Sequence, residues 1–191
     1  REDFTANLIP LLKEGELDIL GLALPVDVPG IVAQRVYEEP FRVVVPAAHE
    51  WAGRKSVRND ELDGQQLLLL GSGNCFRDQV LEACPRLQRA EGLSGSIEGS
   101  SLETIRHMVA SGAGIAVMPS SAADPLVDRE PMVKVLPFAE ASGQVARPGE
   151  SAGVGRTVGL AWRTTFPRPK AVDAVRQAIL SCQLPGVSKA S

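Results

Sequence analysis

The sequence predicts an α/β fold with a largely parallel sheet, and three observations lead to that prediction. Short apolar runs such as LDILGLALP, QLLLLG and GIAVMP are bounded by Gly or Pro, which is typical of buried strands. Segments with helical periodicity, such as SSLETIRHMVASG, alternate with these runs. The 191 residues are 44% hydrophobic but only 4% aromatic, so one large domain or two small lobes would have an aliphatic core.

The first half of the chain predicts one helix followed by three strands. Thr5 or Asn7 can cap a short helix over NLIPLLKEG, which stops at Gly15. The run LDILGLALP up to Pro25 predicts a strand buried on both faces. A second strand, FRVVVPAAH, follows a loop around Pro40. After the polar stretch SVRNDELDG, QLLLLG predicts another buried strand.

The second half predicts three helices and three strands. CFRDQVLEAC reads as a helix, and in SSLETIRHMVASG the residues Ser100 and Glu103 form a capping-box pattern with Gly112 as the stop. GIAVMP predicts a strand that ends at Pro119, followed by the strands VKVLPF and TVGLAWR and a last helix over 170–181. EASGQVARPGESAGVG is rich in Gly, Ser and Pro, which predicts a mobile loop.

Charge and motif content exclude several classes of function. The net charge is -3 with a pI near 5.5, and we find no basic stripe or helix-turn-helix pattern, so this chain alone is not expected to bind DNA. No segment approaches the roughly 20 apolar residues of a membrane span, and REDFTANL lacks an apolar signal-peptide core, so we expect a cytoplasmic protein with no membrane partner. Because REDF resembles the tail of a strand, we also expect upstream sequence to be missing.

Three cysteines without a CxxC spacing predict neither a disulfide scaffold nor a zinc site. His49 and His107 are interpreted as packing or surface residues, so no metal is expected. Cys182 lies in the polar tail, where nothing indicates a partner, and we interpret it as incidental.

The segment GSGNCFRDQVLEACP contains the most informative pair. Cys75 falls at the first helical position after a Gly-rich turn, where free backbone N–H groups and the helix dipole favour an anion, and Arg77 adds positive charge. Both effects favour the thiolate, the form that peroxide oxidises to sulfenic acid. Phe76, Val80 and Cys84 recur every four residues on one apolar helical face, which predicts a buried, unreactive Cys84.

A disulfide between Cys75 and Cys84 is incompatible with this helix. The two residues are nine positions apart, so a straight helix separates them by about 13 Å. A disulfide needs Cα atoms within roughly 7 Å, so the segment would have to unwind, as a two-state switch does. From spacing alone, two inert buried cysteines are the favoured alternative.

These residues resemble a known family. LLLLGSGNCFRDQVLEAC is similar to the redox motif of the OxyR family, the hydrogen-peroxide sensors among the LysR-type transcription regulators. LLKEGELDILGLALP, EEPFRVVVPAAHEWA, SSLETIRHMVASGAGIAVMP and TVGLAWR resemble segments of the LysR-type effector domain, so the resemblance covers nearly the whole chain. GELD and HEWA mark the superfamily, whereas NCFRDQVLEAC is more specific and overturns the inert-cysteine alternative.

The resemblance implies a periplasmic-binding-protein-like fold of two α/β lobes joined by two crossover strands. The crossings are expected near Pro40 and Arg156. Lobe one then comprises 1–41 plus 144–191, and lobe two, with the cysteines, comprises 42–143. By the same comparison, the N-terminal winged helix-turn-helix, its linker helix and the first strand and helix of lobe one are absent from this chain.

The resemblance also implies roles for individual residues. Cys75 matches the peroxidatic cysteine and Cys84 the resolving cysteine of the family. Thr5 corresponds to a threonine that helps to hold peroxide, Arg77 to the arginine of the motif, and Arg156 to an arginine near the site in the reduced form. From the residues alone, Thr5 could instead cap the first helix, Arg77 could be solvated and Arg156 could belong to the flexible loop.

One position departs from the family pattern. Many members carry His immediately before the reactive cysteine, whereas this chain has Asn74. Asn donates and accepts hydrogen bonds but takes up no proton near neutral pH. The helix terminus and Arg77 would then have to stabilise the thiolate, with water as the proton carrier.

The function implied by the resemblance is a regulator that hydrogen peroxide switches through a Cys75–Cys84 disulfide. Peroxide is the reactant, no cofactor is expected, and glutaredoxin with glutathione, or thioredoxin, would reset the switch. The domain would dimerise, and the full protein would bind promoter DNA as a tetramer and contact RNA polymerase. Three alternatives stay open: a metabolite-binding LysR-type domain, a thiol peroxidase and a solute-binding transport protein. Tight ligand binding with thiols that do not react with peroxide would favour the metabolite-binding domain, and steady peroxide consumption with a reductant would favour the thiol peroxidase.

Overall fold

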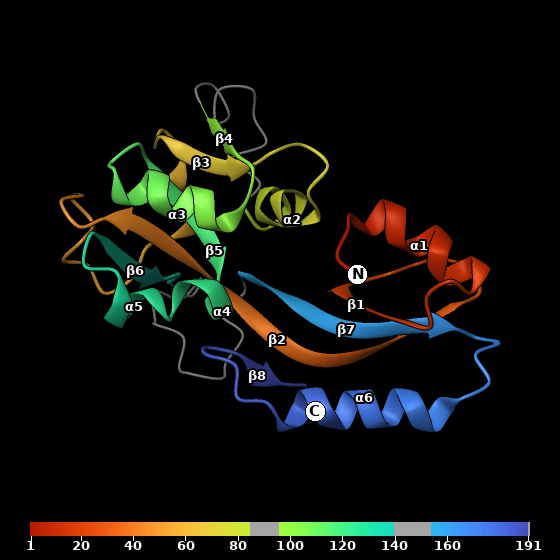
Figure 1. The fold of residues 1–191 in the computed structure, drawn as a ribbon. Helices are drawn as coiled ribbons and strands as arrows, with labels where there is room; N and C mark the ends of the chain where they lie inside the picture. The colour runs from red at the N-terminus through yellow and green to blue at the C-terminus, as the bar shows by residue number, and fades with distance from the viewer. Residues whose placement is uncertain (85–95, 140–153, 191) are drawn as a thin grey trace.

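The computed structural model describes residues 1–84, 96–139 and 154–190, which form two groups of paired strands that share one long strand (Figure 1). That strand is β2, Ile31–Pro46. Helices α1 and α6 lie above and below the strands of one group in the view of Figure 1, and α2 to α5 pack around the other. The elements in chain order are α1 (Thr5–Glu14), β1 (Ile19–Leu24), β2 (Ile31–Pro46), the 3-10 helix η1 (Asn59–Leu62), β3 (Leu67–Leu70), α2 (Cys75–Ala83), β4 (Ile97–Gly99), α3 (Leu102–Ala110), β5 (Ile115–Pro119), α4 (Ser120–Ala123), α5 (Leu126–Arg129), β6 (Val133–Pro137), β7 (Gly155–Arg163), α6 (Pro169–Ser181) and β8 (Ser188–Lys189).

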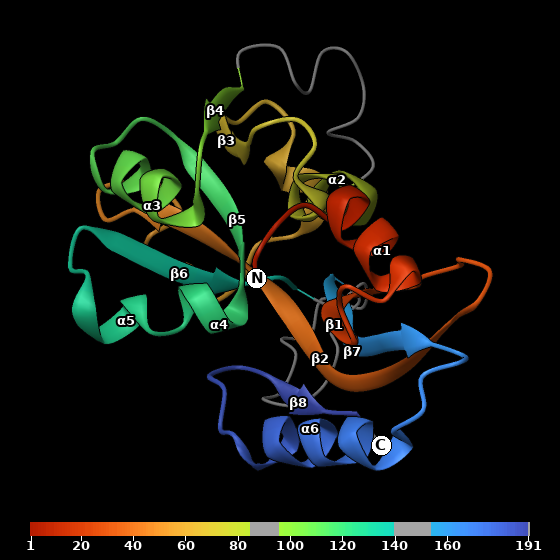
Figure 2. The same ribbon diagram turned by 45° about the vertical axis from the view of Figure 1, so that its right-hand side comes forward.

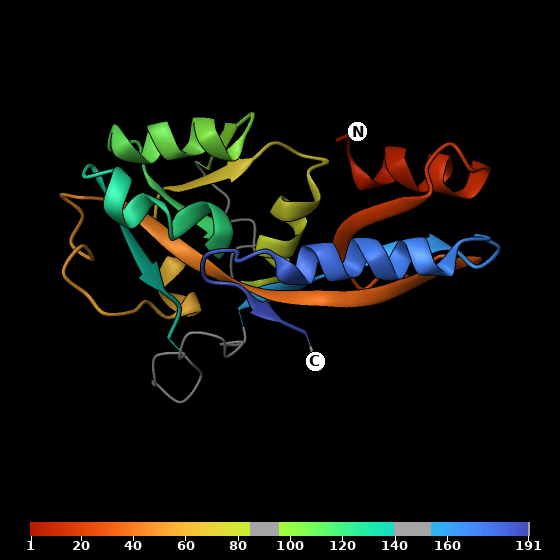
Figure 3. The same cartoon turned by 60° about the horizontal axis from the view of Figure 1, so that its bottom comes forward.

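Strand β2 changes partners at Pro40. Its first part, up to Pro40, pairs with β7, and the part from Phe41 onward pairs with β5 and β6. Figure 2 and Figure 3 show β2 as one continuous curved ribbon that runs through both groups of strands. The loop predicted around Pro40 is therefore wrong: proline lacks an N–H for the ladder but is tolerated where a strand changes its pairing. The lobe boundaries inferred from the sequence stay a prediction.

The prediction of a largely parallel arrangement is wrong at the level of strand direction. β2 is antiparallel to β5, β6, β7 and β8, and β1 is antiparallel to β7. Among the described residues, parallel pairing joins β3 to β4 and to β5. Apolar runs reveal burial but not direction, and β7, a strand from the far end of the chain, lies between β1 and β2 and is antiparallel to both.

Strand β1 is also more open than predicted. Of its six residues, Leu20 is the buried one, and Leu12 and Ala161 join it in a small apolar cluster. β1 pairs with β7 at the edge of the strand order, and part of its surface lines a cavity. β3 and β5, by contrast, are buried along their whole length, because both lie inside the larger apolar core, and this confirms the burial predicted for β3.

Two helix starts differ from the predicted caps. α1 begins at Thr5 with Phe4 as the N-cap residue and no side-chain cap bond, so Thr5 and Asn7 are both helical. Asp3 instead accepts hydrogen bonds from the Phe4 backbone N–H (2.8 Å) and from the Asn7 amide (2.7 Å). The predicted end at Gly15 is confirmed by its left-handed φ of 86°.

Helix α3 is capped one residue later than predicted. Ser101, not Ser100, is the N-cap, and its hydroxyl accepts the Thr104 backbone N–H at 3.1 Å. Gly112 has a φ of 84°, as expected for the residue that ends this helix.

The short elements α4, α5, β4 and β8 were not predicted, because two to four residues give no readable periodicity. Most of the loop predicted over EASGQVARPGESAGVG lies outside the described residues. Within the described ranges, no helix is both long and apolar enough to span a membrane.

Candidate functional site: the two thiols and their surroundings

Cys75 is the first residue of α2 and is exposed. Asn74 precedes it as the N-cap, and its side-chain oxygen accepts the Phe76 backbone N–H at 2.9 Å. The Asn74 backbone N–H donates to the Gly71 carbonyl at 3.3 Å, which closes the preceding turn. Asn74 therefore fixes the start of the helix, a structural task that the sequence interpretation did not assign to it.

Cys84 caps the other end of α2 and is 1% exposed. Its backbone N–H donates to the Val80 carbonyl at 3.0 Å, and the apolar helix face inferred from the sequence is confirmed by the burial of Phe76, Val80 and Cys84. Burial raises the pKa of the Cys84 thiol to about 11, because a thiolate there would be poorly solvated. Cys84 is thus neutral near pH 7. All three cysteines are free thiols.

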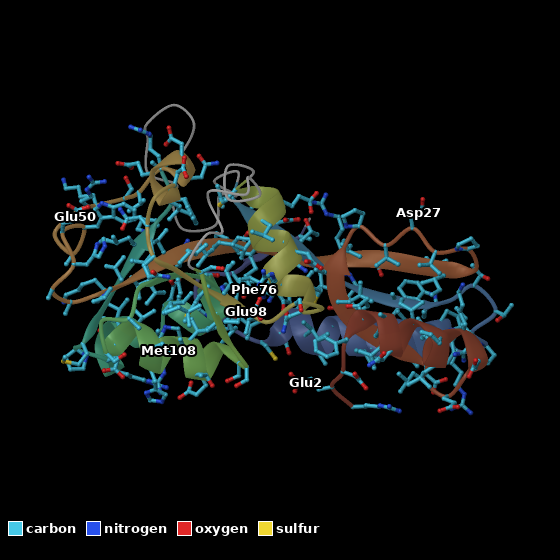
Figure 4. The ribbon with its side chains drawn as sticks, turned by 90° about the horizontal axis from the view of Figure 1, so that it is seen from above. Glu2, Asp27, Glu50, Phe76, Glu98 and Met108 are labelled. Atoms are coloured by element: carbon cyan, nitrogen blue, oxygen red, sulfur yellow. The ribbon has the colours of Figure 1, made fainter. Side chains whose placement is uncertain are left out.

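Arg77 contacts residues of two strands. Its Nη1 donates to the Leu70 carbonyl (2.8 Å) and to Glu98 Oε1 (2.7 Å), so the side chain ties α2 to β3 and β4. Figure 4 labels Glu98 and Phe76, whose positions overlap near the middle of the molecule in that view. Since Glu98 balances the charge of Arg77, stabilisation of a Cys75 thiolate by Arg77 stays a prediction.

A cavity of about 530 Å³ brings three of the expected residues together: Thr5, Cys75 and Arg156. Asn74, Arg77 and Cys84 are not among its described lining residues. Cys182, interpreted from the sequence as incidental, does line this cavity. The remaining wall is mainly aliphatic and comes from α1 and the residue Asp3 before it, from β1, β2 and β7, and from α6 with the residues after it: Asp3, Leu8, Leu20, Gly21, Leu22, Ala23, Val36, Tyr37, Val158, Gly159, Leu160, Ile179 and Leu184.

Arg156 belongs to β7 and not to the loop before it. Its Nε donates to Glu39 Oε2 at 2.7 Å, and its Nη2 lies 2.6 Å from the same oxygen. The guanidinium carbon lies 5.3 Å from the centroid of the Phe76 ring, within cation–π range. Phe76 meets Phe41 edge-on, with ring centroids 5.1 Å apart.

Sequence reasoning missed Glu39 and Tyr37, which lie close to this arginine. Glu39 is 1% exposed, although an acidic residue in the sequence YEEPF suggests a solvated strand end. Tyr37 lines the cavity, and burial, together with the Glu39 charge, raises the pKa of its phenol, while Arg156 opposes that shift. Both residues lie on a strand that continues past Pro40, and this continuity could have indicated that they are buried. It was missed because the sequence predicted a loop around Pro40.

Comparison with known proteins places this arrangement in a family. The model of the LysR substrate binding domain matches residues 1–182. The reduced form of OxyR from Neisseria meningitidis superimposes with a TM-score of 0.84 at 41% identity, covering 100% of this chain and 83% of that one. The reduced OxyR regulatory domain from Pseudomonas aeruginosa gives a TM-score of 0.78 at 42% identity, covering 95% and 81%.

The chain belongs to the OxyR-type regulatory domains of the LysR family. Curated relatives agree: the "DNA-binding transcriptional dual regulator OxyR" of Escherichia coli K12 is 30% identical over 92% of this chain. A "Probable hydrogen peroxide-inducible genes activator" of Streptomyces viridosporus is 33% identical over 93%. This OxyR-type chain spans about half the length of both relatives, 53% in each case. The expected periplasmic-binding-protein-like α/β fold is thereby confirmed.

Proposed function

We propose that this OxyR-type domain senses hydrogen peroxide at Cys75 and reports it by forming a disulfide with Cys84. The observation that carries the proposal is the contrast between the two thiols of one helix: Cys75 is exposed at its first residue, and Cys84 is buried at its end. An exposed thiol can meet a small oxidant, whereas a buried neutral thiol is protected until the helix opens.

The chemistry takes two steps. The Cys75 thiolate attacks one peroxide oxygen, the O–O bond breaks, and the products are a sulfenic acid and hydroxide, which a proton converts to water. After α2 opens, the Cys84 sulfur attacks the sulfenic sulfur, forms the disulfide and releases a second water. Sulfur gives two electrons in the first step, and the second step only condenses the oxidised group with a thiol. Thr5 and Arg156 are the expected neighbours of peroxide in the cavity, and water is the expected proton carrier in place of histidine.

Opening of α2 gives the reaction a structural output. Phe76 and Val80 belong to the larger core, so unwinding between the cysteines must release part of that packing. A changed surface on this half of the domain would alter how two domains pair in a dimer. In a full-length regulator, DNA-binding domains would read that change, with tetramer formation, promoter DNA and RNA polymerase as the implied partners.

The proposed reaction occurs once per chain and not as steady turnover, and it requires no cofactor. Glutaredoxin with glutathione, or thioredoxin, would reduce the disulfide and reset the domain in the cytoplasm. This distinguishes the proposal from a thiol peroxidase, which would consume many equivalents of peroxide per chain when supplied with reductant.

The deciding experiment treats the reduced protein with one equivalent of hydrogen peroxide and maps disulfides by mass spectrometry. We expect a Cys75–Cys84 bond, its loss in Cys75→Ser and Cys84→Ser, and its full retention in Cys182→Ser, the matched control. A protein that reacts without joining Cys75 to Cys84 would refute the proposal. Continuous peroxide consumption with reductant would favour the peroxidase, and tight ligand binding by calorimetry with inert thiols would favour a metabolite sensor.

A further inference from the structure

A buried carboxylate, Glu39, lies behind the residues that line the cavity. Both of its oxygens have partners: Oε2 accepts the Arg156 Nε–H at 2.7 Å, and Oε1 accepts the Ser121 backbone N–H at 3.2 Å. The residue is 1% exposed, whereas 22% of the Arg156 side chain is exposed. A buried carboxylate persists only where such partners offset its lost hydration, so the place of Glu39 determines the place of the Arg156 guanidinium.

Arg156 in turn contacts the redox helix. Its guanidinium carbon lies 5.3 Å from the Phe76 ring centroid, and Phe76 directly follows Cys75 in the first turn of α2. Phe76 is held from another side by Phe41 of β2. A continuous series of contacts therefore runs from Glu39 through Arg156 to Phe76, and it joins strands β2 and β7 to the backbone that carries Cys75.

We propose that Glu39 is a positioning residue for the thiol chemistry at Cys75: it holds Arg156 against Phe76 and at the wall of the Cys75 cavity. The inference rests on the proposed reaction with peroxide. Without the carboxylate, the partly exposed guanidinium can turn toward water, and two things are lost together. The cavity no longer has a cation in a fixed position, and the first turn of α2 loses its contact with β7.

The neighbouring Glu38 provides a matched comparison. It lies on the same strand and also has charged and hydroxyl partners: Arg35 Nη2 at 2.5 Å and the Thr157 hydroxyl, which donates at 2.7 Å. Neither partner is among the described lining residues of the cavity. Glu38→Gln therefore changes the neighbouring carboxylate of the same strand, which is more exposed than Glu39 (21% against 1% of the side chain), and leaves the contacts between Glu39 and Arg156 in place.

The experiment measures the rate constant for oxidation of Cys75 by hydrogen peroxide in the whole chain and in four variants. We expect Glu39→Gln to react about tenfold more slowly, a size typical of directly coupled side chains. Arg156→Met should be slowed at least as much, and Glu39→Gln combined with Arg156→Met should be no slower than Arg156→Met alone. Glu38→Gln should stay within about twofold of the parent protein.

With peroxide, two results overturn the inference: a parent-like rate in Glu39→Gln, or a double variant slowed by the product of the two single effects. The second result would mean that Glu39 acts independently of Arg156, as a purely structural residue does. Glu39→Asp keeps the carboxylate and should recover part of the rate, and it replaces Glu39→Gln in the comparison if the latter does not fold. Alkylation of Cys75 by iodoacetamide gives the same comparison without peroxide. If Cys75 of the parent protein does not react with peroxide, the proposed function is refuted. Equal alkylation rates in the parent protein and Glu39→Gln would separately refute the positioning role of Glu39.

Discussion

Cys75 begins helix α2 and Cys84 caps its other end, so one intact helix keeps the two thiols apart. Over nine positions a helix rises about 13 Å, roughly twice the Cα separation that a disulfide permits. The intact helix therefore requires the dithiol state, because the disulfide cannot form without unwinding it.

Oxidation should expose the backbone of α2. We expect the amides of residues 76–84 to exchange with deuterium faster after one equivalent of peroxide, because the disulfide cannot form while their helical hydrogen bonds persist. Hydrogen exchange read by mass spectrometry, with Cys84→Ser as the control that cannot close the bond, checks this. Equal protection in the oxidised and reduced parent protein would contradict it.

Alkaline pH should weaken the reduced protein through Cys84. Burial raises the pKa of this thiol from 9.0 to about 11, so the folded state favours the neutral form. Its contribution to stability is complete below pH 9 and is lost as the pH rises through about 11. The stability difference between the parent protein and Cys84→Ala, from urea unfolding under reducing conditions, should therefore shrink between pH 9 and 11. Tyr37 titrates in both proteins and cancels, so a constant difference would argue against the raised pKa.

Loss of the Asn74 cap should loosen α2. Asn74→Ala removes the acceptor of the Phe76 N–H, which we expect to lower the free energy of unfolding by about 1 kcal/mol. Asn74→Ser, which can still accept that hydrogen bond, is the control and should lose much less. Urea denaturation of the reduced proteins measures both, and equal losses would show that the cap bond contributes little.

Asn74→His tests the proton-transfer role of this position. We expect faster oxidation of Cys75, because an imidazole can take up or release a proton near neutral pH and an amide cannot. The measurement is the peroxide rate constant from pH 6 to 8, with thermal unfolding to confirm that the helix start survives. A rate that matches the parent protein across this range would show that Asn74 does not limit the reaction.

Variants of the Arg77–Glu98 pair test whether Arg77 only anchors α2 or also promotes the oxidation of Cys75. Arg77→Gln removes contacts to both Glu98 and the Leu70 carbonyl, whereas Glu98→Gln leaves the latter in place. Half of the Glu98 side chain is exposed, so Glu98→Gln should cost less than about 1 kcal/mol and Arg77→Gln more. If Arg77 also favours the Cys75 thiolate, only Arg77→Gln slows oxidation by peroxide. Parent-like oxidation in both variants would leave Arg77 with an anchoring role alone.

Much of the redox helix could be predicted because its signals are local. The turn before Cys75, the four-residue recurrence that ends in Cys84 and the apolar run before them all lie within one short stretch, and each predicted the observed structure. Caps were less secure, since Ser100 and Ser101 offer the same hydroxyl one residue apart. The antiparallel pairing of β2 with β7 joins distant segments of the chain, and the sequence, which indicated a largely parallel arrangement, did not predict it.

Residues around the arginine show why the rest was missed. Glu39 and Arg156 are 117 positions apart in the sequence. Arg77 and Glu98 are 21 positions apart, and part of the segment between them lies outside the described residues. Nothing in either neighbourhood specifies the partner. Thr5, expected near peroxide from the resemblance and readable as a helix cap from the residues alone, lines the cavity through the packing of α1. Long-range pairing, not propensity, decided each of these cases.

Burial of Cys84 also has a consequence for dose. In the proposed reaction, the sulfenic acid at Cys75 waits until the helix opens, and during that interval a second peroxide can oxidise it further to sulfinic acid. Disulfide formation then competes with further oxidation. The rate of the first does not depend on peroxide concentration, whereas the rate of the second is proportional to it. Intact mass at rising peroxide should show disulfide at low dose giving way to sulfinic acid at high dose. The depth at which Cys84 is buried thereby sets an upper limit to the concentrations over which the domain responds reversibly.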